Sequence, residues 1–302
     1  MHRIDIGIDA GGTRTRLEAR SASGDRFTAE GTGSNPRVIG AEACADMVSG
    51  LIHEALGDRI ADASIFLCAG IAGASTDDMQ EALSAGIRRG LTAASSVVVK
   101  VTDDATISFE AAFAGNPGTL LLLGTGSNII CKTNGGRQIH SGGWGYLIGD
   151  EGSGFAIGRL GLRAVARAMD RDLETSLSSR AVRDLGLDER AKFLAAIYGG
   201  SLHVADFAQV VLDEASRGDI ESKRLVSEAV SALVDDLAAT VEAASSELPR
   251  TIRVVGGLSR SSVYMQELRA AIAVRLGDNW HVDPSERTPL EGALWIASRL
   301  TE

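Results

Sequence analysis

Hydrophobic residues alternate with polar or small residues at the start of the chain. Isoleucine occupies every second position from Ile4 to Ile8, which is the period-two pattern of a half-buried β-strand. Gly11–Gly12 interrupts the pattern and predicts a turn. Two further strands are expected over residues 14–20 and 26–30, so the pattern predicts an opening β-meander.

Helix and strand patterns alternate after the meander. Apolar residues recur every three or four positions over 44–55, which predicts an amphipathic helix. A strand, a helix, a strand and a helix are then expected over residues 64–69, 79–89, 97–101 and 104–114. This alternation indicates an α/β sheet with covered faces.

The opening pattern restarts near residue 119. Residues 119–123 predict a buried strand, 124–127 a glycine turn, and 128–132 and 137–140 returning strands. A largely helical region is expected over 156–246, followed by a strand over 252–255 and a terminal helix from about Pro289. The order strand, glycine turn, strand therefore occurs twice, which indicates an internal duplication of structure.

The composition excludes several classes of function. At 302 residues the chain has the length of about two domains, and the loop at 115–118 is the expected boundary between them. A formal charge of −10 leaves no basic face for nucleic acid. No apolar run approaches the roughly 20 residues that span a bilayer, and residues 1–12 contain no signal-like stretch. Three unpaired cysteines fit a reducing compartment, so we expect a cytoplasmic protein.

Two glycine turns follow buried strands and are candidate phosphate sites. In each of them, at Gly11–Thr13 and at Gly124–Ser127, successive backbone N–H groups can form an anion-binding concavity. Asp9, just before the first turn, would lie beside bound phosphates, where it could hold Mg²⁺ directly or through water. One such turn is also compatible with an ordinary hairpin, but two suit a nucleotide.

Asp103 and Asp104 follow the strand expected over 97–101. Aspartate at a helix start is routinely a cap, and a carboxylate at a strand end can also accept the proton of an attacking hydroxyl. We expect Asp103 to cap the helix and Asp104 to act as a base. Their order in the sequence does not by itself decide between these two roles.

The segment 142–154, GGWGYLIGDEGSG, has the composition of a sugar-binding loop. Asp150 can accept bonds from sugar hydroxyls, and Trp144 can pack on ring C–H groups. The Asn35 amide could bridge two hydroxyls or satisfy its own turn, and both interpretations stay open. Gly256–Gly257, after a strand, could flank an adenine.

An ordered set of segments carries a family resemblance along nearly the whole chain. These segments are DAGGT (9–13), SNP (34–36), TDDA (102–105), GTGS (124–127), GGWGYLIGDEGSG (142–154), VVGG (254–257) and EGAL (291–294). The chain resembles the BadF/BadG/BcrA/BcrD-type ATPases, and within them the N-acetylglucosamine and glucosamine kinases.

The resemblance implies a fold and a domain organisation. It implies the duplicated ribonuclease H-like (actin-like ATPase) fold of α/β class, with a nucleotide cleft between two domains. The first domain would comprise residues 1–115 together with the C-terminal helix 289–302, and the second residues 116–288. A homodimer is common among similar proteins.

The resemblance also implies roles for individual residues. Asp104 would be the catalytic base and Asp9 would lie near Mg²⁺. The residues matching ATP contacts are Gly11, Gly12, Thr13, Gly124, Thr125, Gly126, Ser127, Gly256 and Gly257, and the residues matching or suited to sugar contacts are Asn35, Asp104, Trp144 and Asp150.

The expected reaction is transfer of the ATP γ-phosphate to the 6-OH of N-acetylglucosamine. Free glucosamine is the alternative substrate for the same reaction. The chain could also be an ATPase activator of a radical dehydratase, which would need an iron–sulfur cluster on mid-chain cysteines, or a sugar sensor without turnover. Cys131, the last cysteine, lies within an expected strand, which argues against the cluster.

Overall fold

The computed structural model describes residues 2–244 and 248–302. The chain divides into two compact units, which we call the first unit (Met1–Gly115 with Ser285–Glu302) and the second unit (Asn116–Pro284). No helix of the described residues is both long and apolar enough to cross a bilayer.

The first unit is built on a five-stranded sheet with the strand order β3-β2-β1-β4-β5. Its strands are β1 (His2–Ala10), β2 (Arg14–Ser21), β3 (Arg26–Thr32), β4 (Ala63–Ile71) and β5 (Ser96–Thr102). The first three form an antiparallel meander, as predicted, and β4 and β5 run parallel to β1.

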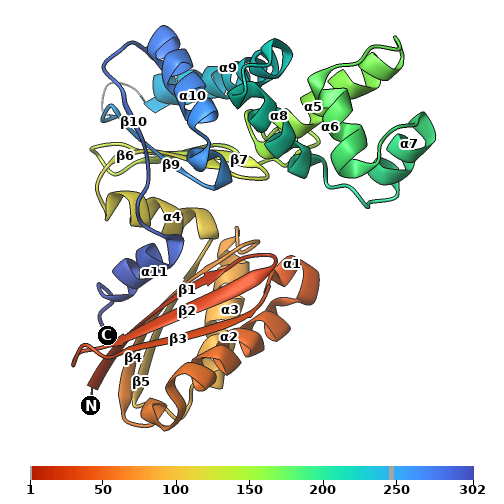
Figure 1. The fold of residues 1–302 in the computed structure, drawn as a ribbon. Helices are drawn as coiled ribbons and strands as arrows, with labels where there is room; N and C mark the ends of the chain where they lie inside the picture. Colours follow the sequence, from red (N-terminus) through yellow and green to blue (C-terminus); the bar gives the residue numbers. More distant parts are fainter. Residues whose placement is uncertain (1, 245–247) are drawn as a thin grey trace. The chain divides into compact units, whose positions relative to one another are not determined.

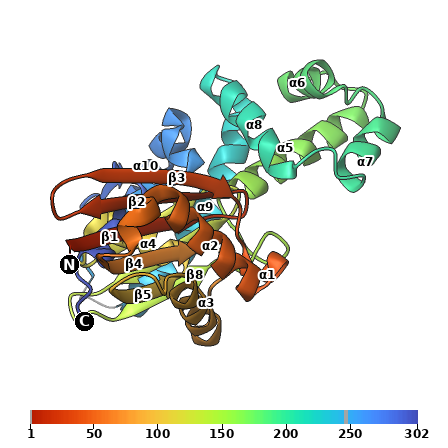
Figure 2. The same cartoon turned by 90° about the horizontal axis from the view of Figure 1, so that it is seen from below.

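Helices cover both faces of this sheet (Figures 1 and 2). They are α1 (Pro36–Ile39), α2 (Ala41–Leu56), η1 (Gly57–Ile60), α3 (Asp77–Gly90), α4 (Asp104–Phe113) and α11 (Pro289–Ala297). The alternating isoleucines of β1, from Ile4 to Ile8, are buried in one core with apolar residues of α2 and α3. Gly7 faces the other side, where a Cβ would lie 2.7 Å from Leu294 of α11, so glycine permits the close packing of that helix.

The second unit contains another five-stranded sheet, with the order β10-β9-β6-β7-β8. Its strands are β6 (Gly118–Leu123), β7 (Ser127–Lys132), β8 (Gln138–Gly142), β9 (Thr251–Val255) and β10 (His281–Pro284). Its helices are α5 (Gly154–Met169), α6 (Ser176–Leu185), α7 (Arg190–Tyr198), η2 (Val204–Asp206), α8 (Phe207–Ser216), α9 (Ile220–Ala244), η4 (Gly257–Arg260) and α10 (Ser262–Leu276). One hydrophobic core joins β6, β7 and β9 to α5, α8, α9 and α10.

The two sheets have the same topology, which confirms the predicted duplication. Each has three antiparallel strands in chain order, and each then adds two strands parallel to the first of them. The sequence missed β10, which has four residues of which only Val282 is buried, and α10, whose apolar residues include the exposed Val274. The predicted helical stretch ended at Ser246, which lies outside the described residues.

Candidate functional site

The first glycine turn, Gly11–Thr13, connects β1 to β2 and is open to solvent over Gly12 and Thr13. The Gly11 N–H donates to the Arg14 carbonyl over 2.9 Å, and the Gly11 carbonyl accepts from the Ser34 N–H over 3.2 Å. The two bonds hold the turn on both sides, while the Gly12 and Thr13 N–H groups donate no bond within the described residues. A Gly–Gly–Thr turn of this kind can present donors to an anion.

Gly33 supports this turn from the neighbouring segment, a role that the sequence analysis missed. A Cβ on Gly33 would lie 2.0 Å from the Gly12 carbonyl oxygen and 2.6 Å from the Thr13 nitrogen. No side chain fits into that contact. One sequence signal was available, because Gly33 directly precedes the Ser-Asn-Pro segment. Gly33 follows β3, however, whereas the turn that it contacts connects β1 to β2.

The carboxylates of Asp9 and Asp104 lie at the carboxyl ends of parallel strands of one sheet. Asp9 is the penultimate residue of β1, and Asp104 is the first residue of α4, two residues after the end of β5. Burial raises the pKa of Asp9, the cation of Arg16 opposes this, and the charge of Asp104 adds to the increase. The two carboxylates are therefore close enough to repel each other, and hard oxygen ligands in this arrangement suit a divalent cation.

Asp103 caps α4, as predicted. Its side chain accepts a hydrogen bond from the Thr106 N–H over 2.6 Å. Asp104 is free of this bond and reaches solvent. Desolvation by the protein packed around its carboxyl, followed by the charge of Asp103, raises the pKa of Asp104. A surface carboxylate with a raised pKa can take up a proton.

Asn35 caps the short helix α1 and lies beside the loop that follows β4. Its Oδ1 accepts from the Arg37 N–H over 2.9 Å, and a Cβ on Gly73 would approach the same oxygen to 2.5 Å. The local interpretation of Asn35 is thus confirmed, because the side chain satisfies its own turn. The amide N–H groups of Asn35 make no bond within the described residues, so its sugar contact stays a prediction.

The second glycine turn, Gly124–Ser127, rests on the N-terminus of α5. The Gly124 N–H donates to the Gly126 carbonyl over 3.0 Å and closes the turn. Two N–H groups of the first turn of α5, from Gly154 and Phe155, donate to the Gly124 and Thr125 carbonyls over 2.8 and 3.0 Å. These bonds satisfy helix donors that would otherwise lack partners, and they fix the turn against a rigid element.

Asp150 braces this same turn. It is buried, and its backbone adopts a φ of 65°, a left-handed conformation that is uncommon outside glycine. One carboxylate oxygen accepts from the Ser127 N–H over 3.3 Å, and the carboxylate packs against Gly126. The structure thus assigns Asp150 a positioning role that the sequence analysis did not include. The sugar contact predicted for Asp150 stays a prediction.

The loop before Asp150 is exposed, although it is rich in apolar side chains. Trp144, Tyr146, Leu147 and Ile148 are between 57% and 82% exposed. The end of the loop is fixed by Tyr264, whose buried hydroxyl donates to the Gly152 carbonyl over 2.7 Å. Trp144 is therefore available for a ligand, and its predicted role remains a prediction.

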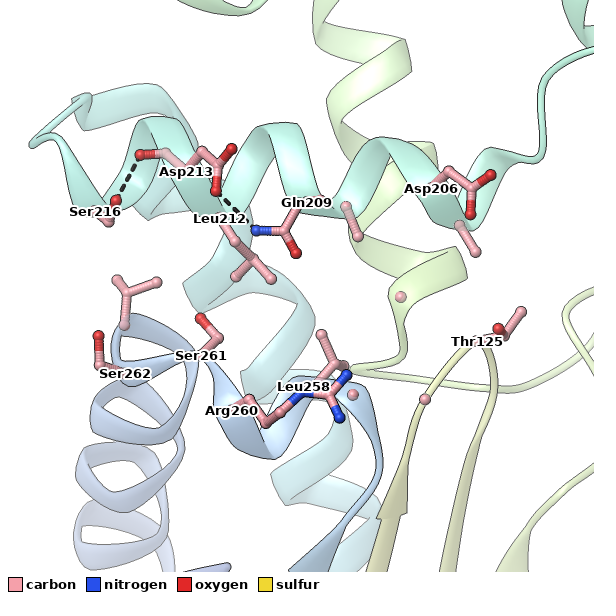
Figure 3. A pocket seen from close by; sticks show the side chains of 16 residues that line it. Thr125, Asp206, Gln209, Leu212, Asp213, Ser216, Leu258, Arg260, Ser261 and Ser262 are labelled. Carbon is pink, nitrogen blue, oxygen red and sulfur yellow. Dashed lines mark hydrogen bonds between the residues drawn. The ribbon is translucent and has the colours of Figure 1, made fainter. Parts of the chain in front are cut away.

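A cavity of about 840 Å³ lies in the second unit beside Gly124 and Thr125 (Figure 3). One wall is α8, and the other is formed by η4 and the start of α10. Gly257 lines this cavity, and Gly256 directly precedes it in the chain; their predicted contact with adenine stays a prediction. Only glycine fits position 256, where φ is 113° and a Cβ would lie 2.3 Å from the Leu123 carbonyl oxygen.

The polar residues of α8 in this cavity were missed by the sequence analysis. They are Gln209 and Asp213, together with Asp206 at the helix start. They belong to no glycine motif and lie on an ordinary amphipathic helix, so no local pattern distinguishes them from a solvated face. Only the tertiary structure, which places α8 across the cavity from η4, reveals them.

Comparison with known proteins assigns the chain to a family. The model of the BadF/BadG/BcrA/BcrD ATPase family matches residues 6–297. The chain belongs to this family. Membership of an ATPase family implies that ATP is used.

Individual relatives agree with this assignment. The chain is 28% identical over 259 residues to an N-acetylmuramic acid/N-acetylglucosamine kinase of Clostridium acetobutylicum, covering 83% of this chain and 84% of that protein. It is 26% identical over 252 residues to an N-acetyl-D-glucosamine kinase of Dictyostelium discoideum, covering 77% of each. The crystal structure of a proposed N-acetylglucosamine kinase from Chromobacterium violaceum has the same fold, with a TM-score of 0.72, 24% identity, and coverage of 98% of this chain and 99% of that one. The predicted duplicated α/β fold is confirmed by this likeness.

Proposed function

We propose that the protein is an ATP-dependent amino-sugar kinase that transfers the γ-phosphoryl group to the 6-OH of N-acetylglucosamine. The observation that carries the proposal is the carboxylate pair of Asp9 and Asp104 at the carboxyl edge of the first sheet. The names of the curated relatives support the same reaction class and substrate class.

Phosphate binding is assigned to backbone N–H groups. The two glycine turns would take the phosphates, and the cavity beside Gly124 and Gly257 would take the nucleoside. Phosphoryl transfer depends mainly on positioning and on neutralising charge. The bonds that brace the second turn against α5 and Asp150 therefore contribute directly to catalysis, because they keep its donors in place.

Asp104 is the proposed general base. As the 6-oxygen attacks the γ-phosphorus, the bond from that phosphorus to the bridging oxygen of ADP breaks. The proton of the 6-OH passes to the Asp104 carboxylate. Two features support this role: the side chain is exposed and does not form the helix cap, and its pKa is raised by desolvation and by the charge of Asp103.

Asp9 is the proposed Mg²⁺ ligand, directly or through water. The repulsion between Asp9 and Asp104 is an electrostatic cost that a divalent cation would relieve, and carboxylate oxygens are the donors that Mg²⁺ prefers. When bound, the ion would neutralise charge on the phosphates. Asn35, Trp144 and Asp150 remain the proposed sugar contacts, with Asn35 supported by its unused amide donors and Trp144 by its exposure.

The three cysteines support a reducing compartment, and we place the enzyme in the cytoplasm. Cys44, Cys68 and Cys131 are all buried free thiols. Their burial also disfavours an iron–sulfur ATPase activator, since cluster ligands must be accessible to the cluster.

The test is a coupled ADP-release assay with Mg-ATP and a panel of sugars. The panel comprises N-acetylglucosamine, glucosamine, N-acetylmuramic acid, N-acetylmannosamine and glucose. We expect N-acetylglucosamine to stimulate ADP release most strongly. Asp104→Asn should lower kcat by about 10²–10⁴-fold and leave ATP binding intact. Asp103→Asn is the matched control, because asparagine also caps helices and the residue is not proposed to touch substrate.

This assay, together with sugar binding and the iron content of the isolated protein, separates the candidate functions. Preferential stimulation by glucosamine would make it the substrate in place of N-acetylglucosamine. Sugar binding without ADP release would indicate a sensor, and iron in the isolated protein would indicate an activator. Near-normal turnover by Asp104→Asn would refute the role of that carboxylate.

A further inference from the structure

The cavity beside the second glycine turn contains a polar constellation that the function above does not use. Gln209 and Asp213 lie one helical turn apart on α8 and face the cavity (Figure 3). The Gln209 Nε2 donates to Asp213 Oδ1 over 2.7 Å. Arg180 of α6 approaches the other oxygen of Asp213 to 3.5 Å and donates to Glu214 over 2.8 Å. The Gln209 amide is thus linked through Asp213 to Arg180 of α6.

This chain of bonds decides which way the amide faces. An ionised carboxylate can only accept hydrogen bonds, so the group of Gln209 that faces Asp213 is its NH₂. The carbonyl oxygen Oε1 is consequently turned away from Asp213, into the space between α8 and Arg260, as Figure 3 shows. The cavity therefore presents a hydrogen-bond acceptor of defined orientation.

The opposite wall offers a flat surface. Arg260 of η4 lines the cavity, and one of its terminal nitrogens lies 3.9 Å from the position of a Cβ on Gly257. Arg260 has no carboxylate partner within the part of the chain that the structure describes. Leu212 and Leu258 supply buried apolar surface between the walls. A planar guanidinium without an ion-pair partner is suited to stack on an aromatic ring.

We propose that Gln209 is the residue that reads the nucleobase, with its Oε1 accepting a hydrogen bond from the 6-amino group of adenine. Asp213 acts as a positioning residue that holds the amide in this orientation. Arg260 stacks on the base and does not discriminate between bases. The inference rests on the proposed nucleotide site and deepens it by naming the side chains that select ATP.

The discriminating chemistry is at position 6 of the purine. Adenine carries an amino donor there, whereas hypoxanthine and guanine carry a carbonyl acceptor. Opposite the Gln209 carbonyl, a second acceptor is repelled and left without a partner. A site that hydrogen-bonds a ligand group rejects the analogue that lacks it, and for one neutral bond at a solvent-accessible site we expect a factor on the order of 10.

The first experiment compares ATP with inosine triphosphate, which differs from ATP only at the 6-position and N1. Binding of each nucleotide to the purified full chain is measured by titration calorimetry, and kcat/KM is measured in the ADP- or IDP-release assay with N-acetylglucosamine. We expect the wild type to prefer ATP about 10-fold. Gln209→Leu should reduce this preference to near unity, mainly by weakening ATP. Gln266→Leu is the matched control, because Gln266 is an exposed glutamine of α10 outside the cavity, and it should keep the full preference.

Two further variants distinguish an effect of the Gln209 amide orientation from general damage to the fold. In Asp213→Asn the neighbour of Gln209 can donate as well as accept, so the amide is free to turn its NH₂ into the cavity. Inosine triphosphate should then bind better than it does to the wild type, a gain that a damaged fold cannot produce. Arg260→Ala should weaken both nucleotides by a similar factor and leave their ratio unchanged.

An unchanged ATP preference in Gln209→Leu would overturn the inference. So would a failure of Asp213→Asn to improve inosine triphosphate. The calorimetric binding measurement also distinguishes this inference from the proposed function. Selective ATP binding without sugar phosphorylation would refute the kinase function but support the role of Gln209 in selecting adenine. Sugar phosphorylation with equal use of both nucleotides would support the kinase function and refute the role of Gln209.

Discussion

The contact between Gly33 and the first glycine turn gives a sharp test of how that turn works. In Gly33→Ala, the new Cβ would lie 2.0 Å from the Gly12 oxygen, 2.3 Å from the Gly12 carbonyl carbon and 2.6 Å from the Thr13 nitrogen. Carbon side-chain atoms essentially never approach other heavy atoms closer than 3.0 Å, so the two segments must separate by about 1 Å. All the obstructing atoms are backbone, and no rotamer change can relieve the overlap.

The turn is the proposed phosphate site, so this displacement should appear in catalysis. A misplacement of about 1 Å can cost on the order of 10²-fold in rate, and we expect kcat/KM for ATP to fall by about that factor. The overpacking should also lower the free energy of unfolding by about 1–3 kcal/mol. The two effects are measured by ADP release at varied ATP and by urea denaturation.

A control glycine lies two residues upstream. In Gly31→Ala the nearest atom to the new Cβ is Cδ1 of Leu51, at 3.5 Å, which is an ordinary van der Waals contact. This variant should retain kcat/KM within a few-fold. If a folded Gly33→Ala protein used ATP as well as Gly31→Ala does, the turn would not be a positioned phosphate site, and the argument would fail.

Two more predictions address the base and the hydrogen bond that fixes the end of the loop 142–154. The raised pKa of Asp104 places the acid limb of the pH–rate profile above the ordinary aspartate value of 3.8, because the base must be ionised. Asp103→Asn keeps the helix cap but removes a charge that raises this pKa, so the acid limb of kcat/KM should move to lower pH; an unmoved limb would show that Asp104 is not the titrating base. Tyr264→Phe leaves the buried Gly152 carbonyl without its donor and should lower the free energy of unfolding by about 1–3 kcal/mol in urea denaturation, whereas a change below about 0.5 kcal/mol would indicate that another donor reaches that oxygen.

Much of the fold could be predicted because its signals are local. The alternating isoleucines of β1, the leucines of β6 and the glycines that end both strands are visible within short windows, since strand periodicity and turn chemistry act between neighbours. The repetition of one order of elements then implied a duplicated fold. The elements that were missed, α10 and β10, lack a clear one-sided apolar pattern, because β10 has only four residues and α10 has an exposed apolar residue, Val274, besides its buried ones.

The residues of the candidate site also fall into those that local sequence predicts and those that only tertiary structure brings together. The sequence by itself determined the two glycine turns, because each depends on the backbone conformation of a few adjacent residues. It offered Asp103 and Asp104 as cap and base without deciding between them, and the structure assigns the cap to Asp103. Only the tertiary structure decided that Gly33 supports Gly12, that Asp150 braces Ser127, and that Gln209 faces Arg260 across a cavity. These contacts join segments far apart in the chain, and their geometry is set by the packing of strands and helices rather than by local propensity. For that reason no pattern within any one segment could have predicted them.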